Sequence, residues 1–106
     1  MQLYNLSDFK GGWFVGNFIP TLFPIEEAEV SIKRYKAGDY DAKHMHKVSD
    51  EITVIVMGRV SMNGELYKED DVILIERGEA TDFIALTDAV TCVVKLPSTK
   101  DDKYLV

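Results

Sequence analysis

The sequence predicts an all-β fold, and three patterns support that prediction. Turn-forming residues recur about every eight to twelve positions, short runs rich in β-branched and aromatic residues lie between them, and helix signals are weak. This spacing is typical of a β-sandwich or a closed barrel. A chain of 106 residues, 46% of them hydrophobic, has the usual size of one globular domain. We therefore expect one domain over residues 1–106, with a short N-terminal extension.

The N-terminal part carries the only helix signal. Ser7 is a suitable N-cap for one helical turn through Lys10, and Gly11-Gly12 would end that turn. The aromatic-rich segment that follows is expected to pack on an open face of the barrel or across a dimer. Nine strands are expected, over residues 13–19, 29–36, 40–46, 51–57, 59–62, 65–67, 72–76, 82–86 and 90–96.

Two of these predictions are specific enough to test pairing and burial. Asn63-Gly64 tolerates the positive φ angles of a type I′ turn, so the strands on either side of it should form a hairpin. The strand at 51–57 is apolar on both alternating faces, which predicts that it is covered on both sides. Alternation places Glu51 on the same face as Thr53 and Ile55.

Charge and composition narrow the classes of function. Eighteen acidic and twelve basic residues give a formal net charge of −6, so we expect no nucleic-acid partner. No stretch approaches the roughly 18 apolar residues of a spanning helix, so we expect no membrane partner. The single cysteine, Cys92, lies in an apolar run and is expected to be a small buried hydrophobe. One cysteine permits no internal disulfide, which favours a cytoplasmic protein.

The two histidines of the chain are the best indication of function. His44 and His46 are separated by one residue, and side chains at i and i+2 leave the same face of a strand. Glu51 begins the next expected strand, where a carboxylate on an apolar face is costly unless it is paired or coordinated. Two imidazoles and one carboxylate suit iron(II), and manganese, nickel and zinc accept related ligands. The competing interpretation is an exposed loop with two ordinary surface histidines and an exposed glutamate.

The spacing around these residues resembles the first motif of the cupin superfamily. That motif reads Gly, five residues, His, one residue, His, three or four residues, Glu, six residues, Gly, and its fixed positions here are Gly38, His44, His46, Glu51 and Gly58. The resemblance implies a double-stranded β-helix, or jelly-roll barrel, with its core over about residues 28–96. It also implies a homodimer and a divalent metal ion (Fe, Mn, Ni or Zn) bound by the two histidines and the glutamate.

The second cupin motif is incomplete in this chain. Gly78 remains, but Thr81 stands where the resemblance places a fourth ligand, a histidine. Asp82, one residue along, would supply an oxygen only if the strand register shifted. Three further residues are candidates for the wall of the site: Tyr35, Lys33 and Tyr67.

Three functions are compatible with these residues. A metal held by His44, His46 and Glu51 would polarise a small carbonyl, carboxylate or sugar-type substrate. Alternatively, the stretch from His44 to Lys47 is similar to metal-independent cupin isomerases of nucleotide-linked keto sugars, in which histidines act as acid and base. The third hypothesis is a cupin that binds a small molecule without catalysis.

Overall fold

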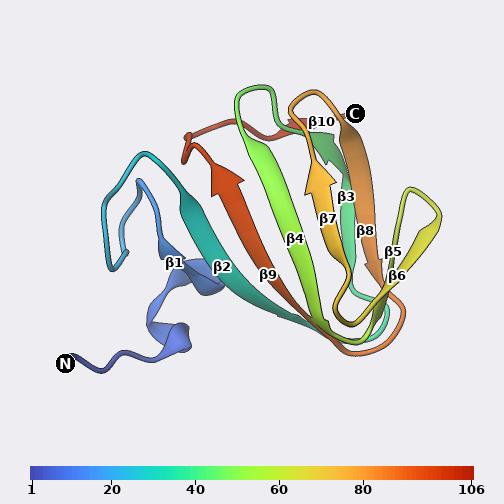
Figure 1. Ribbon diagram of the computed structural model, residues 1–106, viewed down its shortest axis with the longest axis horizontal. Helices are drawn as coiled ribbons and strands as arrows, with labels where there is room; N and C mark the ends of the chain where they lie inside the picture. The colour runs from blue at the N-terminus through green and yellow to red at the C-terminus, as the bar shows by residue number, and fades with distance from the viewer.

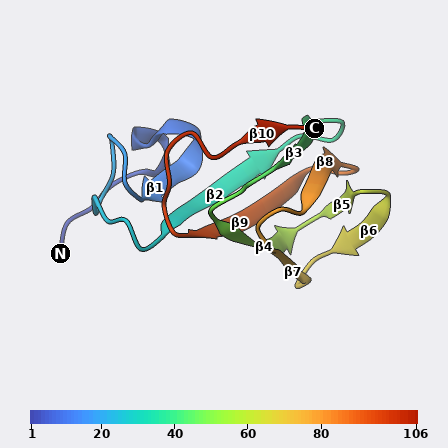
Figure 2. The same cartoon turned by 90° about the horizontal axis from the view of Figure 1, so that it is seen from above.

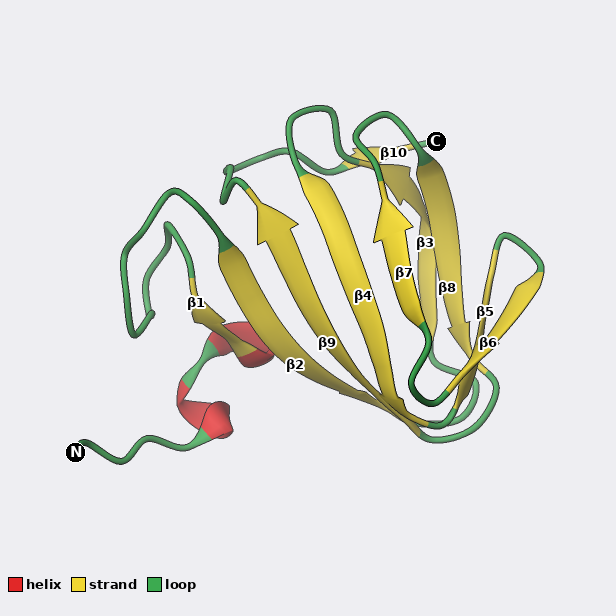
Figure 3. Ribbon diagram, in the orientation of Figure 1, coloured by secondary structure: helices red, strands yellow, loops and turns green.

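The computed structural model describes residues 1–106 and is almost entirely β-structure (Figure 1 and Figure 3). The all-β prediction is therefore confirmed. No helix in the structure has the length and apolar character needed to cross a membrane. In chain order the elements are η1 (Leu6–Asp8), η2 (Lys10–Gly12), β1 (Trp13–Val15), β2 (Glu29–Tyr35), β3 (Tyr40–Met45), β4 (Asp50–Met57), β5 (Arg59–Met62), β6 (Glu65–Lys68), β7 (Val72–Ile75), β8 (Ala80–Ala85), β9 (Ala89–Leu96) and β10 (Tyr104–Leu105).

The strands form two five-stranded antiparallel sheets (Figure 2). The first, which we call the front sheet, has the order β1-β2-β9-β4-β7. The second, the back sheet, has the order β10-β3-β8-β5-β6. From β2 onward the chain passes back and forth between the two sheets, except at the β5–β6 hairpin, so residues distant in sequence face each other across the interior. That arrangement is what brings β3, β4 and β9 around one site.

The N-terminal extension differs in detail from its prediction. The first helical turn begins earlier than expected and is 3-10, because Asn5 rather than Ser7 is its cap and forms a capping box with Asp8. β1 is shorter than expected and pairs with the edge strand β2. It ends before Gly16, whose N–H bonds to Thr21 Oγ1 and to the Phe23 carbonyl instead of continuing the ladder.

Two turns predicted or implied by glycines are present. Asn63 and Gly64 both have positive φ, and Met62 pairs with Glu65, so β5 and β6 form the predicted two-residue hairpin. Gly58 joins β4 to β5 with φ +92°, and a Cβ there would lie 2.2 Å from the Asp88 carbonyl oxygen. No other residue fits that close approach without a shift of the backbone.

β4 has two different faces, and within one chain only the inner face is covered, which differs from the prediction that both are. On the inner face, Thr53 and Ile55 are buried. A bulge between Ile55 and Met57 then breaks the alternation and leaves Met57 44% exposed. On the outer face nothing packs over the strand, and Val56 is 45% exposed.

The hydrophobic core lies between the two sheets. Its buried members come from both sheets and are Ile55, Val60, Met62, Ile75, Phe83, Ala85 and Ala89. Along β4, Ile55 belongs to this core whereas Glu51 and Thr53 line a cavity. The interior is therefore apolar around Ile55 and polar around Glu51 and Thr53.

Candidate functional site

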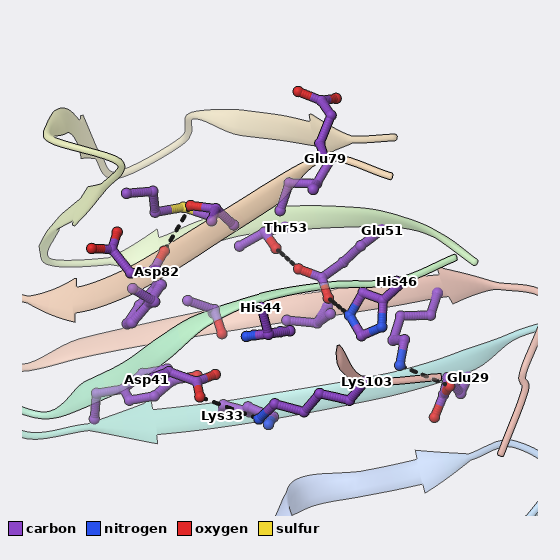
Figure 4. Close-up of a pocket in the computed structure, with 18 of the residues that line it drawn as sticks. Glu29, Lys33, Asp41, His44, His46, Glu51, Thr53, Glu79, Asp82 and Lys103 are labelled. Carbon is purple, nitrogen blue, oxygen red and sulfur yellow. Dashed lines mark hydrogen bonds and ion pairs between the residues drawn. The ribbon is translucent and has the colours of Figure 1, made fainter. Parts of the chain in front are cut away.

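A cavity of about 260 Å³ lies between the two sheets next to the core. Its volume is just below the range of about 300–1,000 Å³ for ligand pockets, which suits a small ligand. Figure 4 shows charged and imidazole side chains around it from both sheets, with Glu51 and His46 facing each other. The charged and imidazole residues that line it are Glu29, Lys33, Asp41, His44, His46, Glu51, Glu79, Asp82, Lys95 and Lys103. So many ionisable groups around so small a space indicate a site for polar chemistry.

A bulge in β3 determines which of its residues face the cavity. Asp41 pairs with Phe83 and His44 pairs with Thr81, so three steps on β3 match two on β8. The extra residue changes the alternation, and Asp41 joins His44 on the inner face. A regular strand would have turned Asp41 outward.

His46 lies just beyond the end of β3 and is held from two directions. Its Nδ1 lies 2.7 Å from the backbone carbonyl of Asp102, and its own carbonyl accepts the Gly78 N–H at 2.7 Å. Because a carbonyl can only accept, Nδ1 carries the hydrogen in that contact. The Nε2 atom is left to face the cavity.

The C-terminal segment around Asp102 makes this anchoring rigid. The Asp102 carboxylate accepts backbone N–H groups from three successive residues, Lys47, Val48 and Ser49, at 2.9–3.1 Å. Burial acts to raise the pKa of Asp102, but these three hydrogen bonds lower it below its ordinary value. β10 then pairs with β3, so the tail is fixed beside the two histidines.

Glu51 faces His46 directly (Figure 4). Its Oε1 lies 3.4 Å from His46 Nε2, and its Oε2 accepts the Thr53 hydroxyl at 3.0 Å. Burial acts to raise the pKa of Glu51, but the contacts with His46 and Thr53 outweigh it and lower the pKa below its usual range. Glu51 is thus a carboxylate that is only 17% exposed and whose lowered pKa favours its charged form.

His44 is in the same cavity but is turned differently. Its Nδ1 lies 2.8 Å from the Ala42 carbonyl, and its ring meets the His46 ring edge-on with centroids 5.2 Å apart. Thr81 pairs directly with His44 across the sheet, and its hydroxyl donates to the Asp82 carbonyl. As the side chains are placed in this structure, no three histidine, cysteine, aspartate or glutamate residues converge on one point as metal ligands would.

The remaining predicted residues divide into two groups. Tyr35, Lys33 and Asp82 line the cavity, and burial together with Asp41 raises the pKa of Tyr35 to about 12. The Asp82 carboxylate accepts the Asn63 N–H at 2.7 Å, so it stabilises the turn between β5 and β6. Tyr67 packs against the hydrophobic core and does not line the cavity.

Several residues of the site were not identified from the sequence. Two are ion-paired lysines: Lys95 lies 3.4 Å from Glu29, and Lys103 lies 3.3 Å from Asp41. Trp13, from the N-terminal extension, lies beneath two lysine ammonium groups. The alternation of residues along β9 could have predicted that Lys95 faces the interior. The positions of Asp41 and Lys103 could not be predicted in this way, because the first results from the bulge in β3 and the second from the packing of the C-terminal tail.

Comparison with known proteins shows similarity of structure but not of sequence. Neither a family model nor a curated protein sequence matches the chain. An uncharacterised Klebsiella pneumoniae protein with a double-stranded β-helix domain superposes with a TM-score of 0.72 at 14% identity, covering 100% of this chain and 97% of that one. KdgF from Halomonas sp. gives 0.65 at 20% identity, covering 73% and 74%.

A third solved structure is a sugar phosphate isomerase from a cupin superfamily, from Silicibacter pomeroyi. It superposes with a TM-score of 0.62 at 18% identity, covering 68% of this chain and 52% of that protein. At such low sequence identities, these similarities show a shared fold and nothing more. Two antiparallel sheets with this strand order, together with these matches, show that the chain has the double-stranded β-helix fold of the cupins.

Proposed function

We propose that this protein binds a divalent metal ion in the cavity through His44, His46 and Glu51, and that the site acts on a small carbonyl, carboxylate or sugar-type ligand. The observation that supports this most is the contact between His46 Nε2 and Glu51 Oε1 at 3.4 Å. With Nδ1 donating to the Asp102 carbonyl, a neutral His46 would present the lone pair of its Nε2 to the Glu51 carboxylate. Two acceptors face each other favourably only with a cation or a proton between them.

The hydrogen bonds that the two histidines make away from the cavity are also those expected of metal ligands. Both histidines have Nδ1 against a backbone carbonyl, Ala42 for His44 and Asp102 for His46. Histidines that bind a metal typically donate the N–H of their other ring nitrogen to such an acceptor. This hydrogen bond fixes the tautomer and leaves the Nε2 lone pair free to coordinate the metal. A bound divalent ion would supply Lewis-acid polarisation of a ligand oxygen. His44 is the one of the three groups that is not yet directed at the His46–Glu51 pair.

Metal loading tests this proposal. Protein treated with a chelator, then dialysed against Fe(II), Mn(II), Ni(II) or Zn(II), is analysed for bound metal, as are His46→Ala and Glu51→Gln. We expect one ion per chain in the wild type and a loss of affinity of at least about tenfold in each variant. Glu65→Gln, on the exposed strand β6, is the control and retains binding. A wild type that takes up none of the four ions contradicts the proposal.

A second candidate function uses the same residues without a metal. It is favoured by the existing His46–Glu51 contact, because a carboxylate that holds an imidazole prepares it to accept and return a proton. Lys47, which completes the isomerase-like tetrapeptide, does not line the cavity and lies 4.1 Å from the centroid of the Tyr104 ring. Exchange of deuterium from the solvent into a keto sugar by metal-free protein, abolished in His46→Ala, would support this function.

We further propose that two copies of the chain associate through the outer face of the front sheet. Two cross-strand rows run over β2, β9, β4 and β7 there, and every member is apolar or a thiol. They are Val30, Val94, Ile52 and Leu74, and Ile32, Cys92, Val54 and Val72. Because neither row carries a charge, two chains of net charge −6 can approach along this face without direct repulsion.

A further inference from the structure

Three polar groups on the inner face of the front sheet make no regular hydrogen bond or ion pair within the chain. The hydroxyls of Ser31 and Thr91 are completely buried and have no hydrogen-bond partner at regular geometry, although the Tyr35 phenol interacts with Thr91. Lys33 forms no ion pair, and its ammonium group lies 5.1 Å from the centroid of the Trp13 ring. Buried polar groups usually find partners, because leaving one unsatisfied costs free energy.

These three groups are neighbours in the sheet. Lys33 on β2 pairs directly with Thr91 on β9, and Ser31 lies two residues before Lys33 on the same face. Lys33 and Thr91 both line the cavity that contains His46 and Glu51. Lys33 and Thr91 therefore lie on one wall of the candidate site, whereas Ser31 lies next to them in the sheet without lining the cavity.

Lys33 differs from the other two lysines of the cavity. Lys95 and Lys103 are each neutralised by an acid within 3.4 Å, Glu29 and Asp41 respectively. Figure 4 shows Lys33 on the same side of the cavity as Lys103 and Asp41. Burial lowers the pKa of Lys33, and Lys103 and Lys95 act in the same direction. Asp41 and Glu51 oppose this through space, without forming an ion pair with Lys33.

We propose that Lys33, with the Thr91 hydroxyl as a further donor, binds the carboxylate of the ligand that occupies the cavity. An ammonium group offers three hydrogens and a hydroxyl offers one, which suits the lone pairs of a carboxylate. The cavity provides acceptors elsewhere, so a neutral ligand would leave Lys33 unsatisfied. The inference rests on the proposed function in one respect, that the cavity takes a small ligand, and it narrows that ligand to an organic acid.

Binding of matched acids and neutral analogues tests the assignment. Chelator-treated, isotopically labelled protein is titrated with lactate and lactamide, and with glucuronate and glucose, and chemical-shift changes are followed by NMR. Without metal, any preference for the acids reports on the protein's own cations. We expect the acid of each pair to bind at least tenfold more tightly than its neutral analogue.

Four variants identify the group responsible. Lys33→Met keeps the length of the side chain and should abolish the preference, whereas Lys33→Arg keeps the charge and should retain part of it. Thr91→Val should weaken acid binding severalfold. Lys36→Met, an exposed lysine outside the cavity, is the control and should match the wild type. Equal binding of acid and neutral analogue, binding of neither, or an unchanged preference in Lys33→Met would each overturn the proposal.

The outcome is separable from that of the metal proposal. Lys33 is not among the proposed ligands, so Lys33→Met should load metal like the wild type. An acid preference in a protein that takes up no metal would leave the carboxylate site standing without the metal centre. Normal metal loading with no acid preference would leave the metal centre standing alone.

Discussion

Around the candidate site, the two faces of the front sheet have the opposite polarity to that of a simple sandwich. The inner face of β2, β9 and β4 carries buried or half-buried polar groups, among them Ser31, Thr53 and Thr91. The outer face carries partly exposed aliphatic rows, in which Val72 is 66% and Leu74 is 58% exposed. Buried polar groups without partners reduce stability, and a ligand can supply the missing partners. An exposed apolar surface typically marks a place where another protein binds. The comparison thus predicts two different uses for one sheet.

The largest expected effect concerns the support of the inner site. Asp102→Ala removes the acceptor of three backbone N–H groups near His46, so we expect unfolding to become easier by about 2–4 kcal/mol. Asp102→Asn keeps one oxygen acceptor and should lose less. Urea unfolding measures both. An Asp102→Ala protein as stable as the wild type would show that the tail does not hold the site.

The next effect concerns the outer face. Leu74→Glu places a charge in the apolar row, and we expect it to convert a dimer into a monomer in sedimentation experiments. Leu66→Glu is the matched control, because Leu66 is 74% exposed but lies on β6 of the back sheet. It should leave the dimer intact. A wild type that is monomeric at high concentration contradicts this use of the face.

A smaller effect separates two threonines of the inner face. Thr53 donates to Glu51, so Thr53→Val should cost about 1–2 kcal/mol, because it leaves a partly buried carboxylate short of a donor. The Thr91 hydroxyl makes no hydrogen bond of regular geometry in the chain, so Thr91→Val should be neutral or stabilising by up to about 1 kcal/mol. Thermal unfolding of the two variants checks this. Equal losses would mean that the Thr91 hydroxyl is not available for a ligand.

The smallest effect is a dependence on pH. The pKa of Glu51 is lowered in the folded protein, so its contribution to stability is complete above the ordinary glutamate pKa and is lost as pH falls through the folded value. Glu51→Gln should therefore flatten the loss of stability between about pH 5 and pH 3. Unfolding free energies at several pH values measure this slope. Glu65→Gln serves as the exposed control, and a slope unchanged in Glu51→Gln would contradict the argument.

Local patterns were sufficient where neighbouring residues make the structure. The Asn63-Gly64 hairpin and most strand boundaries follow from turn chemistry and alternation within a few residues. The same logic failed at Met57 and did not anticipate Asp41, because each depends on a bulge that pairing with another strand imposes. A bulge has no reliable local signal in either segment.

The sequence alone was enough to predict an all-β chain and to single out His44, His46 and Glu51, because these depend on residue type and short spacing. Only the tertiary structure decided how those groups are held. The Asp102 carbonyl that orients His46 comes from 56 residues away. The unpartnered state of Lys33 depends equally on where Asp41 and Glu29 find their own lysines. Whether a polar group lacks a partner depends on all of its neighbours in space, and only the folded chain determines those neighbours.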